Sequence, residues 1–170
     1  AGGNSRHHLQ TLCAMNHLDY KKKGTNSYEQ MFVTIDKLSL PYEQKEEAYR
    51  RMVFNVVGKN CDDHTKNISF RLRQGQPWEL SPAYDISFAH NPKGEWTHQH
   101  LMSINGRFKD FSRADLLELA NRFGIGSAAA VIDQVVSTIA LWSTFAAQAG
   151  VPKGVAENIA GFHLLGLRKA

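Results

Sequence analysis

One polar stretch decides how this chain is organised: Asn60-Cys61-Asp62-Asp63-His64-Thr65-Lys66-Asn67. Two acids, a histidine, a lysine and an asparagine crowd into it, and it follows neither helical nor strand periodicity. A polar turn in which Asp62 caps its own backbone is the simplest interpretation. Because such a loop holds few groups that could pack into a core, we expect its polar residues to cluster for a chemical reason.

A β-hairpin is predicted directly after this loop. Residues 67–72 alternate as a strand does, residues 74–76 supply a turn, and residues 78–80 return as the partner strand. Asp85 comes just after the hairpin, 23 residues beyond Asp62. Since a hairpin brings the chain back beside its starting point, we expect Asp85 to lie near Asn67.

Helices are predicted on both sides of the hairpin. Ser27 caps one helix that runs to residue 38, and Pro41 opens a stronger one to residue 58. Residues 7–16 favour a helical turn, and residues 90–107 follow no period. The remaining helices are expected at 112–124, at 127–150 as one long buried helix, and at 152–166. The predicted fold class is mainly α with one small β-hairpin.

Composition narrows the class of protein. The chain has 170 residues with 42% hydrophobic side chains, which suits one globular domain. A formal net charge of +4 suits a phosphate-bearing ligand, but no dense basic stripe indicates a dedicated nucleic-acid binder. Cys13 and Cys61 are expected as reduced thiols in a cytoplasmic protein. Polar residues such as Asp133 interrupt the most apolar stretch, 128–149, so we expect a buried helix there and no membrane span.

The spacing of the acids and amides indicates phosphoryl transfer. An Asp followed five positions later by an Asn, here Asp62 and Asn67, is the catalytic-loop spacing of phosphotransferases. In that arrangement the Asp orients or deprotonates the acceptor hydroxyl, and the Asn holds Mg²⁺ on the nucleotide phosphates. A carboxylate such as Asp85 beside the amide would complete a set of hard oxygen ligands. Catalytic loop, hairpin and metal-binding Asp follow one another in the C-terminal lobe of the protein-kinase-like fold.

Two motifs together resemble a known family. Residues 62–67, with Leu80-Ser81-Pro82-Ala83-Tyr84-Asp85-Ile86, are similar to the signature of HipA-like kinases, the serine/threonine kinase toxins of bacterial toxin–antitoxin pairs. The segments 27–30, 94–97 and 102–106 also resemble family segments, and the similarity extends to about residue 126.

The resemblance implies a role for each matching residue. Asp62 matches the catalytic Asp, whereas Asn67 and Asp85 match the residues that bind Mg²⁺ and, through it, the phosphates of ATP. His64 is expected to orient the loop, and Lys66 to neutralise transferred or leaving charge. The neighbouring Asp63 occupies a variable motif position.

The resemblance also implies a setting for the whole chain. Residues 1–170 match the C-terminal kinase lobe, and the N-terminal lobe that covers the nucleotide is not expected within them. The expected partners are that N-terminal lobe and a HipB-like DNA-binding antitoxin, so that DNA is contacted only indirectly, through the antitoxin. A further expected partner is a protein substrate such as an aminoacyl-tRNA synthetase or another translation factor.

Two other classes of function fit the same residues. The lobe could serve as a docking or substrate-binding module that is inactive without its partner lobe. Alternatively, Asp62, Asp63 and His64 could bind a metal in a phosphohydrolase. The other histidines lack a paired metal-ligand spacing on any predicted helix, which favours structural or surface roles for them.

Overall fold

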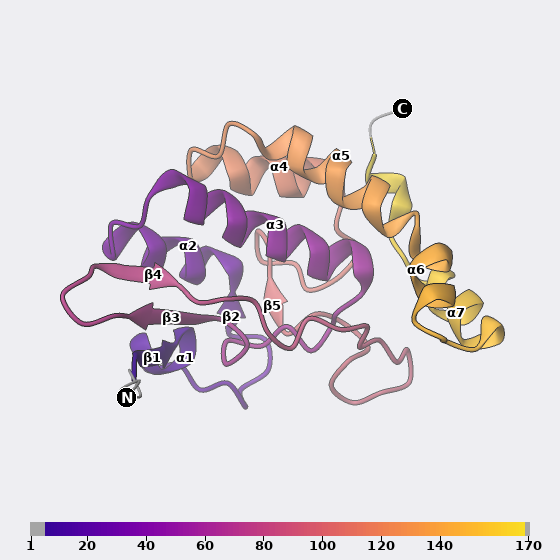
Figure 1. Cartoon of the computed structure of the whole chain (residues 1–170), viewed down its shortest axis with the longest axis horizontal. Coiled ribbons are helices and arrows are strands. Elements are labelled where there is room, and N and C mark those ends of the chain that lie inside the picture. Colours follow the sequence, from indigo (N-terminus) through magenta and orange to yellow (C-terminus); the bar gives the residue numbers. More distant parts are fainter. Residues whose placement is uncertain (1–5, 169–170) are drawn as a thin grey trace, which may run out of the picture.

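A computed structural model describes residues 6–168, which form helices and two small sheets (Figure 1). The mainly α fold with a small hairpin is confirmed. The elements follow in the order β1 (His8–Thr11), α1 (Leu12–Met15), β2 (Asn26–Ser27), α2 (Tyr28–Lys37), α3 (Tyr42–Gly58), β3 (Ser69–Leu72), β4 (Trp78–Leu80), β5 (Met102–Ser103), α4 (Arg113–Arg122), α5 (Ala128–Ile139), α6 (Trp142–Gln148), α7 (Lys153–Ala160) and the 3-10 helix η1 (Leu165–Leu167).

The predicted hairpin is confirmed, but it belongs to a three-stranded antiparallel sheet. β3 is the central strand: it pairs with β4 on one edge and with β1 on the other, so the strand order is β1-β3-β4. The expectation of a helical turn over 7–16 holds only for α1, because His8–Thr11 form a strand. The partner of β1 lies about sixty residues away, with His8 opposite Leu72, so no local pattern could reveal it.

A second long-range pairing lies in the stretch 90–107, where no element is predicted. Asn26 and Ser27 of β2 pair in parallel with Met102 and Ser103 of β5. This pairing brings the start of α2 beside residues 101–103. It therefore brings two segments that lie far apart in the sequence together beside the loop at 60–67.

The helices that position the site begin and end close to where the sequence predicts. Ser27 and Gln30 form a capping box at the start of α2, and Ser112 and Asp115 form another at α4. Pro41 is the N-cap of α3. The apolar residues predicted to form the buried face of α3 are all buried: Ala48, Tyr49, Met52, Val53, Val56 and Val57.

The long buried helix expected over 127–150 is wrong. α5 and α6 are separate helices that meet at 48°. Thr138 donates its hydroxyl hydrogen bond to the carbonyl of Gln134, a back-bond that bends helices, and the indole of Trp142 donates to the carbonyl of Ala156 in α7. The last helix likewise stops at Ala160, and a short 3-10 turn follows it.

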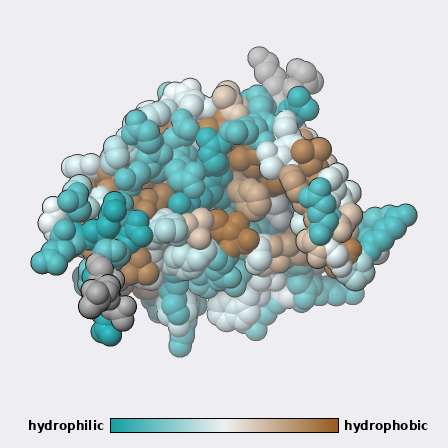
Figure 2. Space-filling model, viewed as in Figure 1, coloured by the Kyte–Doolittle hydropathy of each residue, from teal (hydrophilic) through white to brown (hydrophobic). Residues whose placement is uncertain are grey.

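An apolar groove of about 400 Å³ lies between the end of α3 and α6, with Phe54, Ile139 and Phe145 among its lining residues. Brown, apolar side chains gather near the end of α3 and toward α6 in Figure 2. Within residues 6–168, no single helix is long and apolar enough to cross a membrane; α5 and α6 reach that length and composition only as a bent pair.

Candidate functional site

The loop at 60–67 is fastened to the protein interior through Asp63. This side chain is fully buried, and its carboxylate accepts hydrogen bonds from the Tyr28 hydroxyl (2.7 Å), His100 Nδ1 (2.8 Å) and the backbone N–H of Leu101 (2.7 Å). The donors come from α2 and from the segment before β5, which the β2–β5 pairing has brought together. Asp63 therefore anchors the loop, although its motif position gave no reason to expect this.

His100, which is buried against Asp63, holds its second ring proton at neutral pH. Burial alone would lower the pKa of His100, but the charge and hydrogen bond of Asp63 outweigh it and raise this pKa to about 9. Burial, reinforced by the charge of Asp63, raises the pKa of Tyr28 well above its ordinary value, so the phenol stays neutral and donates.

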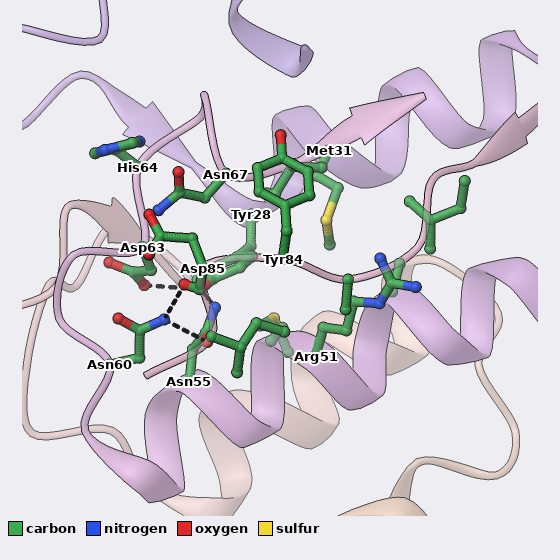
Figure 3. A pocket seen from close by; sticks show the side chains of 16 residues that line it. Tyr28, Met31, Arg51, Asn55, Asn60, Asp63, His64, Asn67, Tyr84 and Asp85 are labelled. Carbon is green, nitrogen blue, oxygen red and sulfur yellow. Dashed lines mark hydrogen bonds between the residues drawn. The ribbon is translucent and has the colours of Figure 1, made fainter. Parts of the chain in front are cut away.

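Hydrogen bonds continue from this anchor to the loop after the hairpin (Figure 3). Asn55 Nδ2 donates to the Tyr28 hydroxyl at 3.0 Å, and Asn60 Nδ2 donates to Asn55 Oδ1 at 3.0 Å. The same Asn60 nitrogen lies 3.3 Å from the backbone carbonyl of Asp85, to which it donates. The chain of contacts thus links the core beneath the first loop to the backbone of the second.

Asp85 has an unusual backbone conformation. Its φ is +53°, in the left-handed region that residues other than glycine adopt rarely and at some cost. Close by, the Tyr84 hydroxyl donates to the carbonyl of Lys66 at 2.6 Å and also hydrogen-bonds the Ser69 hydroxyl. These contacts hold the second loop against the first despite the backbone cost.

Asn67 and Asp85 line the same narrow cleft, where the hairpin predicts them to meet (Figure 3). The cleft has a volume of about 30 Å³, and His64, Asn60 and Arg51 also line it. Asn67 Nδ2 donates to the backbone carbonyl of Asp62 at 3.0 Å, which leaves the amide oxygen as the atom available to a cation.

Of the other expected site residues, Asp62 and Lys66 do not line this cleft. Asp62 lines a neighbouring pocket together with His64, whose Nε2 lies 3.8 Å from Asp62 Oδ1. The Asp62 side chain is 47% exposed. The Lys66 ammonium lies 4.2 Å from the centroid of the Tyr20 ring. His64 is thus the residue shared by the cleft that holds Asn67 and Asp85 and the pocket that holds Asp62.

The donors in the cleft suit a hard cation. An amide oxygen and a carboxylate are ligands that Mg²⁺ accepts, and it takes its remaining ligands from water and phosphate oxygens. Within residues 6–168 no group of three His, Cys, Asp or Glu side chains is arranged to hold a metal. The phosphohydrolase alternative is disfavoured, because both carboxylate oxygens of Asp63 already accept hydrogen bonds from the protein.

Four residues of this site were missed by sequence reasoning: Tyr28, Asn55, Asn60 and His100. Asn55 carried a signal, because it is a polar residue on the buried face of α3. Tyr28 and Asn60 lie within or beside segments that resemble the family. Nothing local distinguishes His100 from the exposed histidine at position 98.

The fold resembles a solved structure. A chain in the Shewanella oneidensis MR-1 toxin–antitoxin complex of HipA, HipB and operator DNA aligns with 95% of this chain, with a TM-score of 0.72 and 19% identity. This chain covers 42% of that one. No curated protein matches it in sequence. The model of the HipA-like C-terminal domain matches residues 2–142, which is most of the chain. This chain therefore belongs to the family of HipA-like C-terminal domains.

Proposed function

We propose that this chain is the C-terminal lobe, over residues 1–170, of a serine/threonine protein kinase that transfers the γ-phosphoryl group of ATP to a protein hydroxyl. The observation that carries the proposal is the joining of Asn67 and Asp85 on one cleft, with Asn67 hydrogen-bonded to the backbone of Asp62. Kinases need a metal-binding pair and an acceptor-orienting Asp in this relation.

Each residue has a distinct task in this proposal. Asn67 and Asp85 would hold Mg²⁺, which supplies charge neutralisation at the phosphates when bound. Asp62 keeps an exposed carboxylate that can accept the proton of the attacking hydroxyl. His64, whose Nε2 lies 3.8 Å from that carboxylate, would orient the loop, and Lys66 would neutralise transferred or leaving charge.

A nucleotide needs more protein than the cleft provides. Its volume of about 30 Å³ is far below the roughly 300–1,000 Å³ typical of small-molecule pockets. The proposal therefore includes a partner N-terminal lobe that covers the adenine, in keeping with the 42% of the Shewanella chain that this chain spans.

The wider partners follow from the family. The Shewanella HipA structure contains HipB and operator DNA. We propose a corresponding DNA-binding antitoxin for this kinase, contact with DNA only through that antitoxin, and a cytoplasmic protein substrate such as an aminoacyl-tRNA synthetase or another translation factor.

Calorimetry of the 170-residue chain with ATP, with and without Mg²⁺, tests the metal site. We expect weak binding that requires Mg²⁺ and disappears on chelation, because carboxylates without the metal repel phosphates. Asp85→Asn should abolish this binding. Asp110→Asn is the matched control, since Asp110 is also exposed and also has a positive φ, of 56°. Tight binding without metal, or equal losses in both variants, would overturn the assignment.

A further inference from the structure

The pocket that holds Asp62 is a separate site from the metal-binding cleft. It has a volume of about 300 Å³ and is lined by Tyr20, Lys21, Asp62, His64, Trp96 and Leu101. His64 lines both spaces, so the pocket that holds Asp62 adjoins the cleft that holds Asn67 and Asp85. This pocket therefore offers an acceptor hydroxyl a route to Asp62.

We propose that this pocket binds the acceptor segment of the protein substrate, through a large apolar side chain next to the serine or threonine and a carboxylate close by. The inference rests on the proposed phosphoryl transfer and adds the chemistry that selects its substrate.

The walls of the pocket are apolar and unusually exposed. Trp96 is 45% exposed, Tyr20 is 36% exposed, and Leu101 lies between the surface and the core. An exposed tryptophan beside a cavity is the kind of residue that dominates binding energies at interfaces. The volume is enough for one leucine- or phenylalanine-sized side chain beside the hydroxyl.

Two lysines cover the faces of the aromatic walls. The ammonium of Lys23 lies 3.8 Å from the centroid of the Trp96 ring, and that of Lys66 lies 4.2 Å from the centroid of the Tyr20 ring. Cations over aromatic faces hold those rings in place by attraction to the ring quadrupole. The walls are therefore positioned before any peptide arrives.

The two walls come from distant segments that are fastened together. Lys23 Nζ contacts Glu95 twice, at 2.9 Å to the carboxylate and at 3.1 Å to the backbone carbonyl. The turn that presents Trp96 is closed by a hydrogen bond from the N–H of Gly94 to the carbonyl of Asn91. A Cβ at Gly94 would lie within 3.2 Å of three atoms of Asn91 and Thr97, so the turn is tightly packed here.

The positive charge of Lys21 favours a substrate with an acidic residue near its acceptor hydroxyl. Lys23 already pairs with Glu95, but Lys21 lines the pocket and its ammonium makes no ion pair with any residue from 6 to 168. A carboxylate one or two residues from the acceptor hydroxyl would meet this unpaired charge.

Peptide binding in the absence of ATP and Mg²⁺ tests the pocket directly. The probe is a nonapeptide, Gly-Gly-Gly-Leu-Ser-Asp-Gly-Gly-Gly, added to the ¹⁵N-labelled chain. The chain has three tryptophans, so each indole N–H resonance can be followed separately. We expect the Trp96 resonance to shift and that of Trp142, which lies in the apolar groove beside α6, to stay in place.

Variants of the chain and of the peptide sharpen the result. Trp96→Ala should weaken binding at least about tenfold. Phe145→Ala is the matched control, because that aromatic side chain is 47% exposed but lies in the other groove, and it should leave binding unchanged. Lys21→Glu should reverse the preference between this peptide and the same peptide with lysine in place of its aspartate.

The outcomes separate this inference from the proposed function. A Trp96 resonance that does not move, a shift at Trp142 instead, or equal binding of a peptide with glycine in place of leucine would overturn the pocket assignment alone. If the peptide binds at Trp96 but a chain joined to an N-terminal lobe transfers no phosphoryl group from ATP, the proposed function fails and the pocket assignment stands.

Discussion

The two halves of this molecule bury different kinds of side chain. Every buried polar or charged side chain within residues 6–168 lies between residues 26 and 103. From residue 104 to residue 168 the buried side chains are all apolar, as in α5, where Val131, Ile132 and Val136 face the core. The first half contains both loops of the candidate site, and the second half packs its helix α5 against α3.

The contrast between the two halves indicates that the buried polar groups fix the geometry of the site loops. Apolar packing of the kind in α5 accounts for stability by itself, whereas each buried polar group costs about 1–3 kcal/mol if it loses its partner. The first half tolerates that risk because its polar groups hold the loops in one geometry. Two neighbouring residues show how exposed chemical groups and buried anchoring groups differ. The Asp62 side chain is 47% exposed, whereas that of Asp63 is fully buried.

The largest effect is expected for Asp62→Asn. In a chain that joins this lobe to an N-terminal nucleotide-binding lobe, the rate of phosphoryl transfer should fall on the order of 10²–10⁴-fold, as expected for loss of an acid/base group. The melting temperature should stay unchanged, because the side chain is exposed and its replacement nearly isosteric. Transfer at the wild-type rate by this variant would remove Asp62 from the mechanism.

Asp63→Ala should instead destabilise the fold, by about 3–5 kcal/mol, because it leaves the charge of His100 buried and unpaired. Ile132→Ala in the apolar half is the control, with an expected loss of about 2–5 kcal/mol from the cavity it creates. Urea titrations give both values. Only Asp63→Ala should also weaken Mg²⁺-dependent ATP binding under conditions where both variants are folded. Equal effects of the two variants on ATP binding would mean that the buried polar groups do not position the site more than apolar packing does.

The buried ion pair also predicts how stability depends on pH. The pKa of His100 is about 9 in the folded chain against about 6.5 when unfolded, so its stabilisation is complete below pH 6.5 and is lost as pH rises through 9. The loss amounts to about 3 kcal/mol at most. Burial lowers the pKa values of His90 and His163, so these two act in the opposite direction, below pH 6.5.

Comparing unfolding free energies of the wild type and of His100→Gln between pH 6.5 and 9.5 isolates the contribution of His100. We expect the slope to flatten in the variant. A wild-type slope that survives the substitution would mean that another group carries the dependence.

The smallest effects on stability are expected for substitutions in the two capping boxes. Ser27→Ala and Ser112→Ala each remove a cap and should each cost about 1 kcal/mol in thermal or chemical unfolding. Ser27 also pairs with Ser103 in the small parallel sheet and precedes Tyr28, so this change alone should lower Mg²⁺-dependent nucleotide affinity. Identical behaviour of the two variants would indicate that the cap of α2 does not help to place the site.

Sequence reasoning predicts those features that short-range patterns encode. The buried face of α3, the caps at Ser27 and Ser112 and the hairpin all follow from periodicity or from side chains three residues apart. The meeting of Asn67 and Asp85 on one cleft follows from the hairpin. β1 and β5 were missed because their partners lie about sixty to seventy-six residues away.

The anchoring role of Asp63 was missed for a different reason. An acidic residue in a polar loop is normally solvated, and only the arrival of Tyr28 and His100 from other elements turns it into a buried partner. The break between α5 and α6 was missed because no proline or glycine lies there. Instead, the Thr138 hydroxyl donates a hydrogen bond to the carbonyl of Gln134, and the Trp142 indole donates one to the carbonyl of Ala156.

The parallel pairing of β2 with β5 has a consequence for the order in which the chain folds. Closing a loop of about seventy-six residues costs conformational entropy before any contact repays it, so such pairings form slowly and late. During synthesis, α2 and the loop at 60–67 leave the ribosome well before Met102 does. Until then Asp63 has no His100 to meet, and we expect the nascent chain to lack a phosphate site until residue 103 has emerged.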